Sequence, residues 1–121
     1  LLVVNKGDRT LGILDPAAGK SVATVALSGV TGHEVAASPD GKTAYVPIFG
    51  DSGVGRPGSD GRTIDVPKAP QEVLVRPDGR VAYVSCDASA QVAEIDLATW
   101  SVARLLPAGK TADGLAWAPL P

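Results

Sequence analysis

The chain of 121 residues contains no methionine, a single cysteine and a single histidine. Because Cys86 is alone, no disulfide can form within the chain. No apolar run approaches the roughly 20 residues that a helix needs to cross a bilayer. The net charge is −2, and lysine and arginine are scattered without a basic stripe. This charge pattern argues against nucleic acid as the main partner, so we expect neither a nucleic-acid nor a membrane partner.

Glycine and proline are abundant instead, with 14 and 10 residues. They interrupt every stretch that shows a helical period, so we expect no helix beyond a single turn. This composition is typical of many short strands joined by tight turns. The length leaves room for one domain with a modest core.

The most informative feature is an internal repeat. Residues 33–46 (HEVAASPDGKTAYV) align with residues 71–84 (QEVLVRPDGRVAYV), and residues 113–119 (DGLAWAP) form a partial third copy. A second set of copies fills the intervening sequence, because residues 1–15 match residues 82–96. A period of about forty residues built from short apolar runs predicts a repeat architecture.

Each copy divides into short apolar runs that we interpret as strands. The most complete copy predicts strands at Gln71–Arg76, Arg80–Ser85, Gln91–Asp96 and Trp100–Leu106. The same pattern predicts strands at Leu1–Asn5, Thr10–Asp15, Lys20–Leu27, His33–Ser38, Lys42–Ile48, Arg62–Val66 and Asp113–Ala118. Four antiparallel strands in about forty residues are typical of a β-propeller blade.

The predicted fold is therefore all-β, a single domain over residues 1–121 with about three blades. Blade 1 covers residues 1–27 and is completed by a strand at 113–118, blade 2 covers 33–66, and blade 3 covers 71–106. After Val66 the pattern jumps to Pro67–Gln71, as though whole repeats had been excised. We therefore expect the middle blade to be incomplete and to lack its outer strand.

Several segments resemble the repeat of the YVTN-type β-propeller proteins. They are residues 38–46 (SPDGKTAYV), 76–84 (RPDGRVAYV), 93–99 (AEIDLAT) and 12–20 (GILDPAAGK). The resemblance covers nearly the whole chain outside residues 50–70, and it implies blades around a central channel. Many members are exported, so it also implies a periplasmic or secreted protein. Relatives by fold include lactonases and the haem d1 domain of nitrite reductases.

Three blades are fewer than the roughly four to eight of natural single-chain propellers. The chain begins with a second strand and ends with a first strand, so Asp113–Ala118 of one chain can pair with Leu1–Asn5 of a neighbour. Such pairing would hide an exposed strand edge. We expect a head-to-tail homo-oligomer, with a dimer favoured over a trimer. An arc that does not close, as in a fragment, is the alternative.

His33 and Glu34 are candidate binding residues. They start an inner strand, which in a propeller places them near one mouth of the channel. His33 is a candidate metal ligand, shared between subunits because one histidine per chain is too few for a zinc or haem site within one chain. The alternative is a polar strand end in contact with water. We expect no cofactor.

The long loop of residues 50–61 is the second candidate site. Asp51, Ser52, Arg56 and Asp60 offer groups for a cation or an anion, because long loops on a rigid scaffold often bind ligands. Their spacing matches neither a calcium loop nor a P-loop, so a simple insertion is the alternative.

Other polar and aromatic residues are interpreted as structural. Asp40 and Asp78 recur in Pro-Asp-Gly turns, and Asp15 and Asp96 recur at strand ends, where a carboxylate can bond local backbone N–H groups. Cys86 is interpreted as a plain thiol. Trp100 and Trp117 are read as packing residues, and an outer-strand Trp100 can alternatively mark an interaction patch.

The sequence favours a non-enzymatic binding or interaction scaffold. Its rival is a metal-dependent, lactonase-like hydrolase with a site at the channel mouth. A third hypothesis is an engineered or truncated repeat assembly without a specific activity. A stoichiometric amount of metal bound to the protein would distinguish the hydrolase hypothesis from the scaffold hypothesis.

Overall fold

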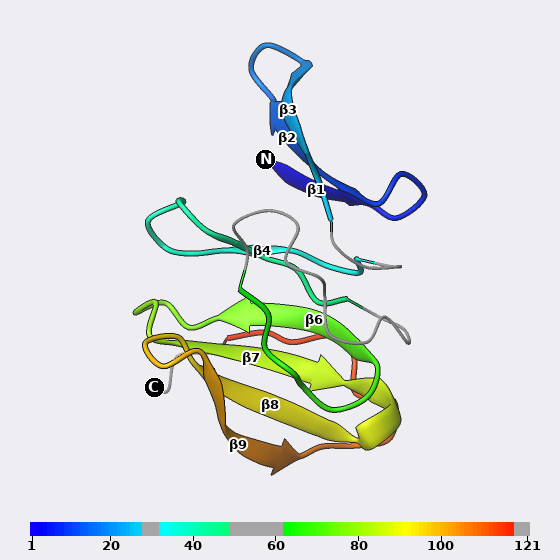
Figure 1. Ribbon diagram of the computed structural model, residues 1–121, viewed down its shortest axis with the longest axis vertical. Coiled ribbons are helices and arrows are strands. Elements are labelled where there is room, and N and C mark those ends of the chain that lie inside the picture. The colour runs from blue at the N-terminus through cyan, green and yellow to red at the C-terminus, as the bar shows by residue number, and fades with distance from the viewer. Residues whose placement is uncertain (28–31, 49–61, 118–121) are drawn as a thin grey trace.

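The computed structural model describes residues 1–27, 32–48 and 62–117 as three sheets arranged one after another (Figure 1). Among these residues every regular element is a strand, except for one short 3-10 turn, η1 (Asp87–Ser89). The all-β prediction is therefore confirmed. No helix of the described part is long and apolar enough to span a membrane.

Blade 1 is a three-stranded antiparallel sheet. It contains β1 (Leu2–Asn5), β2 (Thr10–Asp15) and β3 (Lys20–Ala26), in that spatial order. The register between the first two strands places Val3 opposite Gly12. One edge of β1 bonds to β2, and no strand of the described residues pairs with its other edge.

Blade 3 is the most complete unit. Its four antiparallel strands follow chain order as β6 (Pro70–Val75), β7 (Val81–Cys86), β8 (Gln91–Asp96) and β9 (Ser101–Pro107). Each boundary lies within one residue of the sequence prediction, so the four-stranded blade is confirmed here.

The middle blade is much less regular than predicted. Its strands shrink to β4 (Ala36–Ala37) and β5 (Ala44–Tyr45), with one isolated bridge between Gly32 and Ile48. The predicted strand at Arg62–Val66 is wrong, because these residues have no regular structure. Pro47 gives a physical reason for the short pairing of β4 with β5, because its carbonyl oxygen accepts from His33 and proline has no N–H to donate on that side.

The repeated aspartates all accept hydrogen bonds from their own turns, as predicted. The Oδ1 atom of Asp96 accepts from the N–H groups of Ala98 and Thr99, at 2.8 and 3.0 Å. Asp78 Oδ1 accepts from the N–H of Arg80 at 3.0 Å. Equivalent bonds join Asp15 to the N–H groups of Ala17 and Ala18, and Asp40 to the N–H of Lys42. The turn glycines Gly41 and Gly79 both have φ of 70°.

The core lies where the middle blade packs against blade 3. One face of β6, β7 and β8 contributes the buried residues Val73, Ala82, Val84, Cys86, Ala93 and Ile95. The middle blade covers that face with Ala36, Tyr45, Ile64 and Val66. Ile64 and Val66 therefore contribute to the core although they form no strand.

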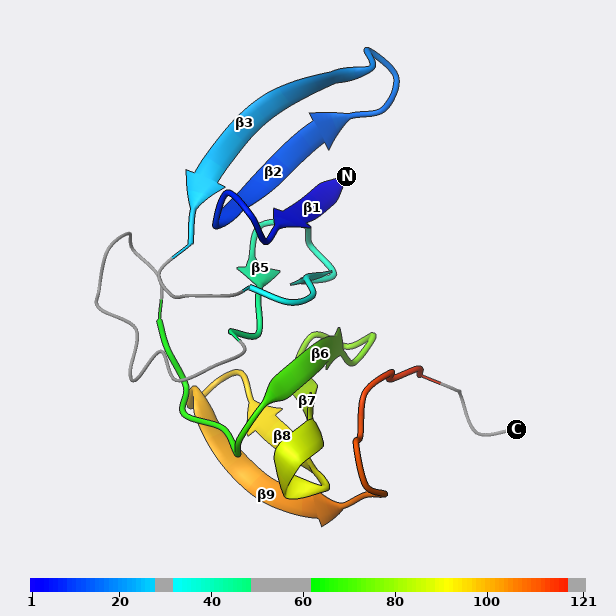
Figure 2. The same cartoon turned by 90° about the vertical axis from the view of Figure 1, so that its right-hand side faces the viewer.

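The C-terminal segment, residues 113–117, lies against the opposite face of blade 3 (Figure 2). It was predicted to be a strand, but it has no strand hydrogen bonds in this structure. It contacts β6 and β7 instead, through Glu72 and Tyr83. Its pairing with β1 of a neighbouring chain stays a prediction.

Candidate functional site

Only two of the predicted site residues lie within the described structure. The N–H of His33 donates to the carbonyl oxygen of Pro47 at 3.0 Å, which fixes the histidine at the end of the middle blade. Its Nδ1 lies 3.6 Å from Oε1 of Glu34, and the two side chains are 24% and 55% exposed. They form a neighbouring acid–imidazole pair in which the Nδ1 atom itself is buried.

The remaining predicted residues, Asp51, Ser52, Arg56 and Asp60, lie outside the described residues. The structure therefore does not test whether they approach His33. Within the described ranges, no three histidine, cysteine, aspartate or glutamate side chains group closely enough to hold a metal ion.

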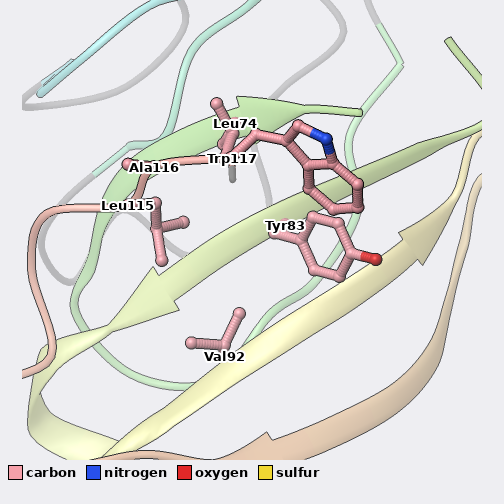
Figure 3. A pocket seen from close by; sticks show the side chains of 6 residues that line it. All are labelled: Leu74, Tyr83, Val92, Leu115, Ala116 and Trp117. Carbon is pink, nitrogen blue, oxygen red and sulfur yellow. The ribbon is translucent and has the colours of Figure 1, made fainter. Parts of the chain in front are cut away.

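One concave surface is an apolar pocket on blade 3, with a volume of about 180 Å³. One wall comes from alternate residues of the sheet, and the other comes from the C-terminal segment (Figure 3). The lining residues are Leu74, Tyr83, Val92, Leu115, Ala116 and Trp117. The pocket thus lies between one face of blade 3 and the extended segment 113–117, and we call this contact the seam.

Two contacts hold the segment in this seam. The Trp117 ring stacks on Tyr83, with ring centroids 6.3 Å apart and planes 21° apart. Figure 3 shows the two rings side by side above the sheet. The backbone N–H of Leu115 donates a hydrogen bond to Oε2 of Glu72. An aromatic anchor and a charge-assisted hydrogen bond therefore position the backbone of the segment.

Charged residues border the apolar pocket on the same blade. Arg104 donates to Glu94 across β8 and β9 at 2.8 Å, and Arg76 pairs with Asp78 at 2.8 Å. The guanidinium of Arg104 is the main cause that lowers the pKa of Glu94, and Tyr83 contributes further. A second, wider hollow of about 510 Å³ lies at the Pro-Asp-Gly turn, between Arg76 and Asp96.

The pocket offers an apolar surface bordered by charged side chains. Its polar groups are already paired or hydrogen-bonded, and its centre is apolar. Such a surface can bind an extended segment that offers an aromatic side chain and a free N–H. The interpretation of Trp117 as a packing residue does not by itself predict the pocket. The alignment of Leu74 and Tyr83 with Ala36 and Tyr45, which face a neighbouring blade, is the signal that could have found it.

These sheets define a partial fold of the β-propeller type. Among solved structures, hydrazine synthase from Kuenenia stuttgartiensis matches with a TM-score of 0.74 and 20% identity over 92% of this chain. A 6-phosphogluconolactonase-like protein from Bacteroides fragilis matches with a TM-score of 0.66 and 18% identity, also over 92%. The dihydro-heme d1 dehydrogenase NirN, in complex with DHE, matches with a TM-score of 0.61 and 20% identity over 93%.

These similarities show the fold alone. The chain spans 33%, 36% and 25% of the length of those three proteins. No family model matches the chain. No curated protein matches it either.

Proposed function

We propose that this chain is a non-enzymatic interaction scaffold, built from repeats of the YVTN type, whose blade faces bind extended apolar polypeptide. The observation that carries the proposal is the seam on blade 3. There an irregular segment is held by the stacking of Trp117 on Tyr83 and by the Glu72 carboxylate. The repeat supports it further, because equivalent residues of the middle blade, Ala36 and Tyr45, also face a neighbour.

The seam can be tested by supplying the segment as a separate peptide. A fluorescently labelled peptide of residues 111–117 (TADGLAW) is titrated into the Trp117→Ala chain, and its anisotropy is followed. The Trp117→Ala substitution weakens the contact of the chain's own segment 113–117 with blade 3, so we expect the peptide to bind in its place. In the unsubstituted chain, the chain's own segment would compete with the peptide at a high effective concentration.

The matched control is the same peptide with alanine in place of tryptophan. We expect it to bind at least about tenfold more weakly, since it loses both the buried aromatic area and the stacking on Tyr83. Equal binding of the two peptides, or no binding of either, would contradict the proposal.

A second candidate function is a metal-dependent, lactonase-like hydrolase at the channel mouth. The observation that favours it is the His33–Glu34 pair, with Nδ1 and Oε1 3.6 Å apart. In this candidate, His33 of more than one subunit holds the metal. Metal analysis of protein purified without chelator tests it, together with thermal shifts on adding Zn²⁺, Ca²⁺ or Mn²⁺. A metal-free protein without a shift would exclude it, and a shift lost in His33→Ala would favour it.

A further inference from the structure

The contact between the middle blade and blade 3 shows how two neighbouring blades pack in this chain. The middle blade presents Ala36 and Tyr45 to the next blade. Blade 3 receives them on the face formed by Val73, Ala82, Val84, Ala93 and Ile95. Each blade therefore has a donor face, directed toward the following blade, and an acceptor face, directed toward the preceding one.

Blade 3 has a donor face without a following blade among the described residues. Leu74 and Tyr83 of this face align with Ala36 and Tyr45 in the repeat. The described residues that contact this face include Leu115, Ala116 and Trp117 of the segment 113–117. Trp117 is still 46% exposed there. The donor face is thus only partly covered.

Blade 1 has the complementary acceptor face. Residues 1–15 align with 82–96, so Leu1, Val3, Gly12 and Leu14 correspond to Ala82, Val84, Ala93 and Ile95. In blade 3 those four positions are at most 5% exposed. In blade 1 the same face is less uniform, because Leu1 is 69% exposed, Val3 and Leu14 are half-buried and Gly12 is buried. The opposite side of blade 1 packs toward the middle blade, where a Cβ built on Gly32 would lie 3.1 Å from Val4.

Among the described residues, only one edge of the β1 backbone is paired. Leu1 exchanges two hydrogen bonds with Leu14 of β2, at 3.0 and 2.8 Å. Because backbone groups alternate sides along a strand, Leu2 and Val4 direct their N–H and C=O groups to the other edge. No described strand pairs there. In blade 3 the equivalent edge of β7 is occupied by β6.

We infer that the partner of both open faces is a second copy of this chain, bound head to tail. This inference rests on the proposed function, since it names the partner of the same seam. Residues 113–117 of one copy add to the open edge of β1 in the other copy, and the donor face of blade 3 packs on the acceptor face of blade 1. The sequence of 113–117 supports this, because it aligns with the inner strand β6, which precedes β7 and β8 in blade 3.

Blade 3 also sets the register of the added strand. There Val73 lies opposite Val84, Leu74 opposite Tyr83, and Val75 opposite Ala82. Transferred through the repeat, these pairs become Leu115 opposite Val3, Ala116 opposite Leu2, and Trp117 opposite Leu1. A shift by one residue would turn the apolar side chains to the wrong face.

Disulfide formation between separately produced full-length variants tests both partner and register. The variants are Val3→Cys, Leu2→Cys, Leu115→Cys and Ala116→Cys, and they are mixed in pairs under mild oxidation. The native Cys86 is 0% exposed and stays out of the reaction. Cα distances in paired strands lie within the range that a disulfide spans.

We expect covalent dimers from the matched mixtures, Val3→Cys with Leu115→Cys and Leu2→Cys with Ala116→Cys. The mismatched mixtures, Val3→Cys with Ala116→Cys and Leu2→Cys with Leu115→Cys, should yield several-fold less. Each variant occurs in both kinds of mixture, so a folding defect cannot imitate this pattern.

Equal yields from all four mixtures, or no covalent dimer from any, would overturn the inference. If the peptide of residues 111–117 still binds the Trp117→Ala chain in that case, the scaffold proposal stands and only the partner is wrong. If the peptide also fails to bind, the scaffold proposal and the inferred partner are both wrong.

Discussion

At the scale of single residues, the repeated aspartates hold the turns between strands through hydrogen bonds from backbone N–H groups. Hydrogen bonds from the N–H groups of Thr99 and Ala98 lower the pKa of Asp96. The pKa of Asp78 is also lowered, chiefly by the Arg76 side chain. A carboxylate whose pKa is depressed on folding stabilises the fold above its unfolded pKa, and this stabilisation is lost as pH falls through the folded pKa.

We therefore predict that Asp96→Asn lowers the melting temperature near neutral pH and flattens its decline in acid. The amide cannot carry the charge, and its oxygen is a weaker acceptor for the turn N–H groups. Melting curves from about pH 6 down to about pH 2 check this. A variant whose decline parallels that of the parent would contradict it.

Cys86 behaves as a structural thiol. It is 0% exposed and its Sγ lies 3.5 Å from the carbonyl oxygen of Val84. Burial raises the pKa of the thiol, so little thiolate forms near neutral pH. We predict that a thiol reagent modifies native protein at least about a hundredfold more slowly than protein in denaturant. Rapid modification of the native chain would show that this face of blade 3 opens readily.

At the scale of elements, Trp100 joins two blades. It precedes β9, in a left-handed conformation with φ of 56°, where the aligned residue of blade 1 is Gly19. Its ring lies 6.1 Å from that of Tyr45, and the guanidinium of Arg62 lies 5.4 Å from its centre. The contact supports its interpretation as a packing residue.

We predict that Trp100→Ala lowers the free energy of unfolding by about 1–2 kcal/mol, through the lost aromatic and cation–π contacts. Trp100→Gly should lose less than Trp100→Ala, because glycine adopts the left-handed conformation without strain. Urea unfolding compares the three chains. An alanine variant as stable as the parent would contradict the role of Trp100.

Strand prediction was accurate where apolar alternation and turn chemistry coincide. In blade 3 the Pro77-Asp78-Gly79 turn and the alternating residues of β7 identify the same hairpin, and its boundaries were predicted closely. In the middle blade Pro47 weakens pairing, and Ile64 and Val66 reach the core from irregular backbone. Apolar pattern alone does not distinguish a strand from an extended segment that packs by its side chains.

The candidate site was only partly predictable. His33 and Glu34 are adjacent in sequence, so their proximity follows directly from the chain. The seam depends instead on Trp117 meeting Tyr83, a contact between segments far apart in the sequence. This contact between Trp117 and Tyr83 can be predicted only in two steps. Residues 113–117 must be interpreted as an inner strand, and the face of β7 that has no following blade must be known.

At the scale of the whole molecule, the proposed interface predicts opposite outcomes for similar substitutions on the two faces of blade 1. Leu14→Glu places a charge on the acceptor face of blade 1, so it should disrupt assembly and reduce the solution mass to that of one chain. Val25→Glu is the matched control, because Val25 lies opposite Leu11 on the other face of the blade and is 41% exposed. It should leave the mass unchanged. Equal effects of both substitutions would argue against a specific interface.

The measurement that tests the central claim most directly is the solution mass of the unmodified chain, by light scattering on a sizing column. Two complementary blade faces, with about three blades in each chain, predict a closed ring and therefore a sharp species of two chains. A mass equal to the 12.2 kDa of one chain, over the micromolar range and above, would contradict the account.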